Sequence, residues 1–151
     1  MRYFLYLCLA SCLLLSACAL PPDKDEVARN LAATIRLGWT CLDVEQVQIL
    51  DLVQSGKDWK VDASYRIRLT CNKSSLPPEE QQRFEHYLPM CSSVLVQTGD
   101  ACTLRESALF SESAHGWMPK DLMAANPDIL PLVAKEAKEA QKAKADAAAK
   151  K

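Results

Sequence analysis

Four cysteines in the body of the chain could act either as metal ligands or as disulfide partners. They are Cys41, Cys71, Cys91 and Cys102, and they stand thirty, twenty and eleven positions apart. Metal sites usually draw their ligands from closely spaced pairs, and the sequence contains no CxxC or HxxxH pair. We therefore expect no metal and no other cofactor, and we interpret these thiols as disulfide partners.

The two histidines are the usual candidates for acid and base catalysis. No GxSxG motif, HExxH motif or phosphate-binding glycine loop accompanies His86 or His115. The adjacent Glu79 and Glu80 are more simply explained as partners of a helix dipole than as a catalytic pair. The sequence thus predicts no catalytic residue and no enzyme, and a buried cleft holding either histidine beside a carboxylate would reverse that prediction.

The start of the chain has the composition of an export signal. Arg2 is followed by a largely apolar, uncharged run over residues 3–15. Crossing the hydrocarbon core of a bilayer takes about 20 apolar residues in a helix, so this run is too short for a transmembrane segment. We expect residues 1–17 to be a signal peptide that takes no part in the fold.

The end of this signal, Leu15-Ser16-Ala17-Cys18, resembles the lipobox of bacterial lipoproteins. In that family the signal is cut before the cysteine, whose sulfur and amino group both receive acyl chains, and several chains make anchoring effectively permanent. The resemblance implies lipidation of Cys18, membrane lipid as a partner and residues 18–22 as a short tether. Ala19, in place of an aspartate, implies the outer membrane, with the domain facing the periplasm or the cell surface.

Export also bears on the remaining thiols. Cys8 and Cys12 leave with the signal, and Cys18 is consumed by lipid, so an even number of cysteines reaches an oxidising compartment. Two disulfides are expected, and three pairings of the four cysteines stay open.

The charge pattern argues against nucleic acid as a partner. The formal net charge is −1, with no concentrated basic footprint in the body of the chain. Residues 135–151 are basic, with six lysines against three acidic residues. Such a tail could attract anionic envelope polymers, and Lys151 could in principle be linked to peptidoglycan.

Hydrophobic periodicity predicts a helix followed by a hairpin. The helix is expected from Asp23 to about Gly38, with Val27, Leu31 and Ile35 on one face. A strand over residues 44–53, a turn at 55–58 and a strand over 59–71 follow. The second strand alternates strictly, with apolar residues at odd positions, which predicts an antiparallel hairpin with one dry face.

A second helix and a further strand complete the predicted domain. The helix is expected to begin at Pro77, and Pro89 is expected to kink or divide it. Its apolar stripe consists of Phe84, Leu88, Cys91 and Leu95. A strand over 102–110 then ends in a turn at 113–117. This order predicts an α+β domain over residues 23–127, with a small antiparallel sheet covered by helices and stabilised by disulfides.

Residues 128–151 are expected to form an exposed tail, helical or disordered. Ala, Lys and Glu dominate from Ala134 onward without an apolar stripe, so this part is predicted to contribute nothing to a core.

The Gly116-Trp117 pair after a strand resembles cystatin-like and NTF2-like exported domains, in which a helix packs on a curved sheet. The resemblance implies a concave sheet face that could bind a ligand, and it carries over no functional residue. Trp39, Trp59 and Trp117 are interpreted as core residues.

These features predict a non-enzymatic envelope lipoprotein that interacts with another, unidentified envelope protein or acts as a scaffold. The alternative is a module that binds a small ligand or inhibits a hydrolase. A large apolar pocket would favour the ligand, and an exposed apolar patch would favour a protein partner.

Overall fold

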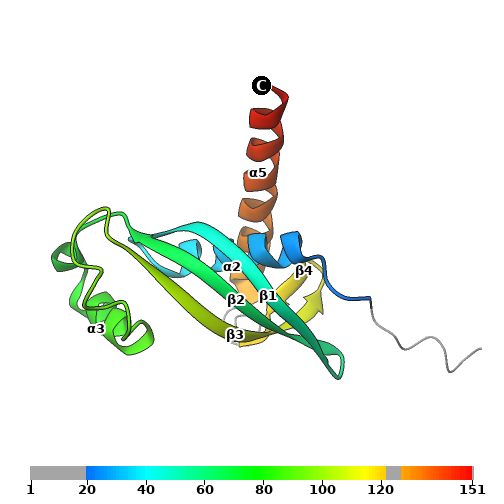
Figure 1. Cartoon of the computed structure of the whole chain (residues 1–151), viewed down its shortest axis with the longest axis horizontal. Coiled ribbons are helices and arrows are strands. Elements are labelled where there is room, and N and C mark those ends of the chain that lie inside the picture. Colours follow the sequence, from blue (N-terminus) through cyan, green and yellow to red (C-terminus); the bar gives the residue numbers. More distant parts are fainter. Residues whose placement is uncertain (1–19, 122–126, 151) are drawn as a thin grey trace, which may run out of the picture.

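The computed structural model describes residues 20–121 and 127–150. The predicted signal peptide, the lipidation site Cys18, Ala19 and Lys151 lie outside these residues. Helices packed on an open, antiparallel four-stranded sheet confirm the predicted α+β class (Figure 1). In these two ranges, no helix combines the length and the hydropathy that a membrane crossing requires.

Helix α2 (Lys24–Gly38) confirms the first predicted element. Asp23 caps it, because the Asp23 carboxylate accepts a hydrogen bond of 3.0 Å from the amide of Asp25. Asp25 and Glu26 in the first turn lie at the positive end of the helix dipole. The buried residues of the helix are Val27, Asn30, Leu31 and Ala33.

The sheet has the order β1-β2-β3-β4, and every neighbouring pair is antiparallel. Its strands are β1 (Leu42–Ser55), β2 (Asp58–Leu69), β3 (Ala101–Ser113) and β4 (Gly116–Pro119). The predicted hairpin is therefore β1-β2, and its turn uses Gly56 at a φ of 67°, a conformation that favours glycine.

The alternation of β2 divides the sheet into an inner and an outer face. The apolar odd-numbered residues of β2 are all buried on the inner face: Trp59, Val61, Ala63, Tyr65, Ile67 and Leu69. All of them except Trp59 belong to the main core, together with residues of α2 and Phe84. The polar residues between them lie on the outer face, as one dry and one wet side require.

Pro89 ends the second predicted helix instead of kinking it. Helix α3 spans Pro78–Tyr87, and after it the chain continues through turns. Proline lacks an amide hydrogen, and it disfavours helical backbone in the residue before it, so the helix stops ahead of the ring. The predicted stripe is nonetheless buried, because the turns hold Leu88, Cys91 and Leu95 toward the core.

The turn predicted at residues 113–117 contains the start of an additional strand. β4 pairs with β3 from Ser113↔Gly116 to Phe110↔Pro119. Helix α2 secures this short strand through polar side chains: Asn30 donates to the carbonyl of Trp117 at 2.8 Å, and Glu26 accepts from the Trp117 amide at 3.0 Å. Asn30 is buried, so this contact is part of the packing between helix and sheet.

Helix α5 (Leu130–Ala149) follows a short 3₁₀ turn (Pro127–Ile129) and projects away from the sheet (Figure 1). The prediction that residues from Ala134 onward contribute nothing to a core is wrong for Ala134 and Ala137. Both are buried with Leu130 and Val133 against Ala33 and Met118 in a second, smaller core. Small side chains allow α5 to approach α2 closely, while the later turns of α5 are exposed.

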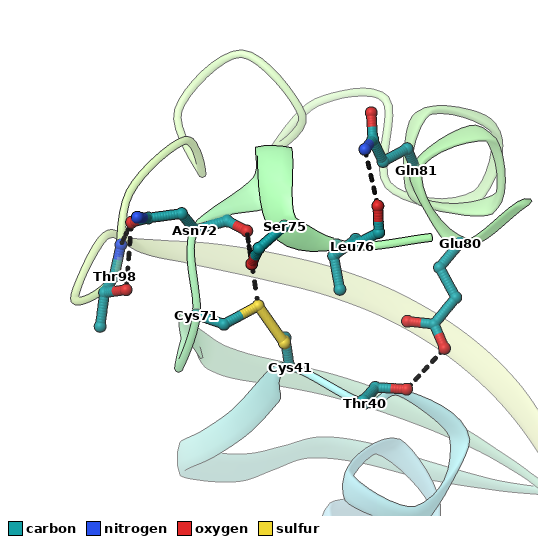
Figure 2. The surroundings of a disulfide bond; sticks show 9 residues. All are labelled: Thr40, Cys41, Cys71, Asn72, Ser75, Leu76, Glu80, Gln81 and Thr98. Atoms are coloured by element: carbon teal, nitrogen blue, oxygen red, sulfur yellow. Dashed lines mark hydrogen bonds between the residues drawn. A yellow bond between two sulfur atoms is a disulfide. The ribbon is translucent and has the colours of Figure 1, made fainter. Parts of the chain in front are cut away.

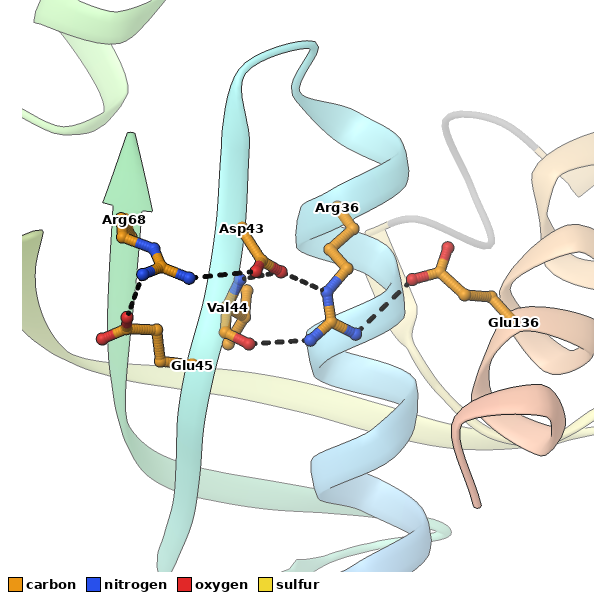
Figure 3. Close-up of polar contacts among 6 residues, drawn as sticks. All are labelled: Arg36, Asp43, Val44, Glu45, Arg68 and Glu136. Atoms are coloured by element: carbon orange, nitrogen blue, oxygen red, sulfur yellow. Dashed lines mark hydrogen bonds and ion pairs between the residues drawn. The ribbon is translucent and has the colours of Figure 1, made fainter. Parts of the chain in front are cut away.

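Arg36 connects α5, α2 and β1 (Figure 3). Its guanidinium pairs with Asp43 at 2.7 Å, donates to the carbonyl of Val44 at 2.7 Å and lies 3.5 Å from Glu136 of α5. Arg68 continues the network to Glu45 at 3.2 Å. The hydrogen bond from Arg36 holds the pKa of Asp43 below its usual value.

Acid should destabilise this fold through its aspartates. Lys120 and then Ser111 lower the pKa of Asp58, and Ser107 lowers that of Asp62. In the unfolded chain the pKa of an aspartate is about 3.9. When folding lowers this pKa, the ionised carboxylate stabilises the fold at a pH above about 3.9, and this stabilisation is lost as the pH falls through the folded-state pKa. The thermal midpoint should therefore drop below about pH 4, and Asp58→Asn should reduce the drop. Calorimetry between neutral pH and acid measures both, and a midpoint that rises on acidification would contradict this assignment.

Candidate functional site

The segment between β2 and β3, residues 70–100, forms a lobe at one end of the sheet, which we call the α3 lobe (Figure 1). Disulfides fasten it at both junctions with the sheet. Cys41 and Cys71 are joined with a Cα–Cα distance of 5.5 Å, and Cys91 and Cys102 with one of 5.8 Å. The two predicted disulfides are thus confirmed, and the pairing left open by the sequence is decided.

Hydrogen bonds order the chain around the first disulfide (Figure 2). The side chain of Asn72 accepts from both the amide and the hydroxyl of Thr98, at 3.0 and 3.1 Å. The Glu80 carboxylate accepts from Thr40, and Gln81 donates to the carbonyl of Leu76 at 2.7 Å. These bonds tie α3 to both the start of β1 and the beginning of the lobe.

The Asp100 carboxylate closes the other side of the lobe. It accepts from the amides of Gln97 at 2.7 Å and Val96 at 2.9 Å. These two hydrogen bonds lower the pKa of Asp100, so the carboxylate is ionised at neutral pH and holds the turn before β3.

Aromatic packing fixes α3 against the end of α2. Phe84 is fully buried and meets the Trp39 ring edge-on, with 5.7 Å between centroids. The guanidinium of Arg83 lies over the Trp39 ring, 4.9 Å from its centroid, and donates to the carbonyl of Gly38 at 3.3 Å. The α3 lobe is therefore held in one position relative to α2 and the sheet.

This fixed lobe exposes a set of apolar side chains, which we call the lobe patch. Tyr87 is 66% exposed, Met90 83%, Val94 52% and Val96 51%. Tyr87 ends α3, and the other three lie on the turns that follow it, where the remaining apolar side chains, Leu88, Cys91 and Leu95, are buried. Met90, Val94 and Val96 are apolar but fall outside the predicted stripe of Leu88, Cys91 and Leu95, and this surplus of apolar residues after Pro89 is the signal that could have revealed the patch from the sequence.

The two histidines do not come together. His86 is exposed on α3 with its ring edge-on to Tyr87, and His115 is exposed in the β3–β4 turn at another part of the sheet. His115 lines an open hollow of about 170 Å³ with Glu26, whose carboxylate already accepts from the Trp117 amide. Neither histidine lies in a buried cleft. Within residues 20–121 and 127–150, no group of three His, Cys, Asp or Glu side chains is placed to hold a metal ion.

The concave sheet face implied by the resemblance is filled in the part of the chain that the structure describes. Between α2 and the inner face, the remaining space beside Leu31 and Phe110 measures about 10 Å³, too little for a ligand. Tyr65 closes this space by donating to Glu106. Burial, and then Glu106, raises the pKa of Tyr65, so its hydroxyl is not a base near neutral pH.

The larger hollows are open surface. One of about 600 Å³ is lined by residues of α3 alone, and one helix cannot enclose a ligand. Another of about 290 Å³ lies between α2, β1 and α5, where Arg29, Arg36 and Lys144 face Asp25 and Glu45. Its mixed charges select neither anions nor cations.

Comparisons of the chain with protein families, with curated proteins and with solved structures find no match.

Proposed function

We propose that this protein is a lipid-anchored envelope lipoprotein that binds another envelope protein through the lobe patch. The observation that carries the proposal is the exposure of Tyr87, Met90, Val94 and Val96 on a segment fastened at both ends by disulfides. Contiguous apolar surface, in contrast to single exposed apolar residues, marks protein interaction sites, and these four side chains belong to one segment of ten residues. A pre-ordered surface also loses little conformational entropy on binding.

The position of the patch fits an anchor at Cys18. Asp23, which caps α2, follows Cys18 by five residues, so the start of α2 is held within about 18 Å of the lipid, at no more than about 3.6 Å per residue. Helix α2 then runs along the sheet, and the α3 lobe lies beyond the C-terminal end of α2 (Figure 1). The start of α2, where the tether ends, and the α3 lobe are thereby separated by the length of α2. Ala19 supports the outer membrane as the location.

Lipidation is tested by Cys18→Ala in the full-length chain. The unsubstituted protein should carry acyl mass on the residue 18 sulfur and fractionate with the outer membrane. The variant should gain no lipid mass. Intact mass spectrometry and membrane fractionation measure both, and an unmodified Cys18 in the unsubstituted protein would exclude the anchor.

Partner binding is tested by a photo-crosslinking residue placed at Val94, combined with Met90→Lys. A charge in the middle of an apolar contact must be desolvated on binding, so the Met90→Lys change should reduce crosslinking to an envelope protein about tenfold or more. The matched control is Leu132→Lys, because Leu132 has an exposed fraction of 54% on α5, outside the patch. Equal crosslinking in the two lysine variants would remove the lobe patch from the binding surface.

A further inference from the structure

The sheet has three stretches of edge: β1, β4 and the part of β3 beyond β4. β4 pairs only with residues 110–113 of β3. Within residues 20–121 and 127–150, the stretch 101–109 of β3 therefore has one strand neighbour, β2, with which it pairs without a register shift. Regular strand edges with unpaired amides and carbonyls are templates for pairing with another chain.

The β1 edge is obstructed along its length. Two register shifts interrupt it, between Val44 and Gln46 and between Ile49 and Asp51. The amide of Val44 donates to the side chain of Asp43, and its carbonyl accepts from Arg36. Farther along, the amide of Leu52 donates to the Asp51 carboxylate at 2.8 Å. Bulges and local side-chain bonds of this kind prevent a further strand from adding to β1.

The β4 edge is also occupied, because the amide and the carbonyl of Trp117 bond to Glu26 and Asn30 of α2. These bonds also determine which residues of β3 direct their backbone groups toward β2 and which direct them away from it. Trp117 faces Glu112 across the ladder, and Pro119, which has no amide hydrogen, faces Phe110. In both pairs the two residues exchange no backbone hydrogen bonds, so the even-numbered residues Glu112 and Phe110 direct their backbone groups toward β2. Because this direction alternates along a strand, the odd-numbered residues of β3 direct their amides and carbonyls away from β2.

The outward backbone groups on this edge are those of the odd-numbered residues between 101 and 109, of which Thr103, Arg105, Ser107 and Leu109 are exposed. Among the described residues, no backbone amide or carbonyl bonds to these groups on the side away from β2. β3 has no register shift with β2, and its open part contains no proline and no lysine. Of the three edges, this one alone has neither a register shift nor a backbone group bonded to α2 in the described chain.

We propose that residues 101–107 of β3 pair in antiparallel fashion with the same segment of a second copy of this chain. A two-fold axis makes such a contact self-complementary, since each outward residue both donates to and accepts from its counterpart. Arg105 and Glu106 are the only charged side chains in the segment, and their charges cancel. The edge therefore presents no net charge that would select an acidic or a basic peptide in place of the second copy.

The charges exclude two registers, and the full overlap of residues 101–107 with their counterparts selects the axis at Leu104. An axis at Arg105 or at Glu106 would oppose like charges directly, which destabilises a strand pair. An axis at Leu104 places Arg105 opposite Thr103 of the second copy and brings the two Leu104 side chains together. Leu104 is partly buried against the core, so its contact with a second Leu104 extends the apolar inner face across the dimer. The paired sheets form one continuous eight-stranded sheet, since each copy contributes four strands.

The register gives the experiment its design. In the full-length chain, Leu104→Cys places two thiols at a non-bonded pair on the axis, where Cα atoms are about 4.5 Å apart, within the span of a disulfide. Arg105→Cys and Glu106→Cys place them about 7 Å and about 13 Å apart along the strands, beyond that span. Under mild oxidation, Leu104→Cys should give about tenfold more covalent dimer than either neighbour. Val53→Cys, exposed on β1, measures random collision.

A second measurement needs no added cysteine. Amide exchange of Thr103, Arg105 and Ser107 in the unsubstituted protein should slow as protein concentration rises, and Ser107→Pro, which removes an amide that does not bond to β2, should abolish that dependence. Mass mapping of the two native disulfides confirms that each cysteine variant is folded. Equal dimer at all four positions, crosslinked species of another mass, or exchange that is independent of concentration would each overturn the proposal.

Discussion

Replacing Cys41 and Cys71 together by alanine should lower the free energy of unfolding by about 3–4 kcal/mol, because their bond closes a loop with a sequence separation of 30. The same change at Cys91 and Cys102, with a separation of 11, should cost about 3 kcal/mol. The difference follows from loop-closure entropy, which grows with the logarithm of loop length. Urea unfolding of the two double variants measures both values.

The two variants should also differ in where they loosen the protein. Loss of Cys91–Cys102 removes the disulfide between the lobe and β3, and the hydrogen bonds of Asp100 and Asn72 remain to hold that turn. Amide exchange should then accelerate over residues 88–99 while β1 and β2 stay protected. Uniform acceleration across the sheet would show that the lobe does not open as a separate unit.

Gly116→Ala should lower the free energy of unfolding by about 2–3 kcal/mol. Gly116 has a φ of 94°, and an added Cβ would lie 2.2 Å from a carboxylate oxygen of Glu26. A side chain at positive φ costs about 1–2 kcal/mol. Displacement of Glu26 also removes its hydrogen bond to the Trp117 amide, which is worth about 0.5–1.5 kcal/mol.

Gly99→Ala is the matched control for this substitution. Gly99 has a φ of 98°, but no atom lies within 4 Å of its added Cβ. Its cost should be the conformational part alone, about 1–2 kcal/mol. Calorimetry of both variants with the disulfides intact separates the two contributions. If Gly116→Ala is no worse than Gly99→Ala, the contact of Glu26 with β4 does not stabilise the fold.

The sequence predicted best those elements whose burial follows a simple period. β2 is buried on one face and wet on the other, so its strict alternation is visible in the residues themselves. β1 alternates less regularly because two register shifts change which face its residues occupy. The number of cysteines pointed to two disulfides, but their pairing depends on how the lobe folds back onto β3, which no local pattern records.

The remaining differences come from contacts between distant segments. β4 has only four residues and includes a proline, and it is held by Asn30 and Glu26 from the first helix. The buried side of α5 includes Ala134 and Ala137. Because alanine is small, the helical spacing of buried residues from Leu130 to Ala137 was not recognised in the sequence as an apolar stripe. The lobe patch was missed because Phe84, Leu88, Cys91 and Leu95 were interpreted as one helix stripe, which left the exposed turns after Pro89 without a role.

The Cys41–Cys71 disulfide also determines how the domain would carry mechanical load. If a partner pulls on the lobe patch while lipid holds the other end, tension travels from Asp23 through α2 to Cys41 and crosses directly to Cys71. Because the disulfide transmits the force from Cys41 directly to Cys71, residues 42–70, which include β1 and β2, do not carry the tension. The first element to stretch is then α2, which is braced by Asn30 and Glu26 against β4.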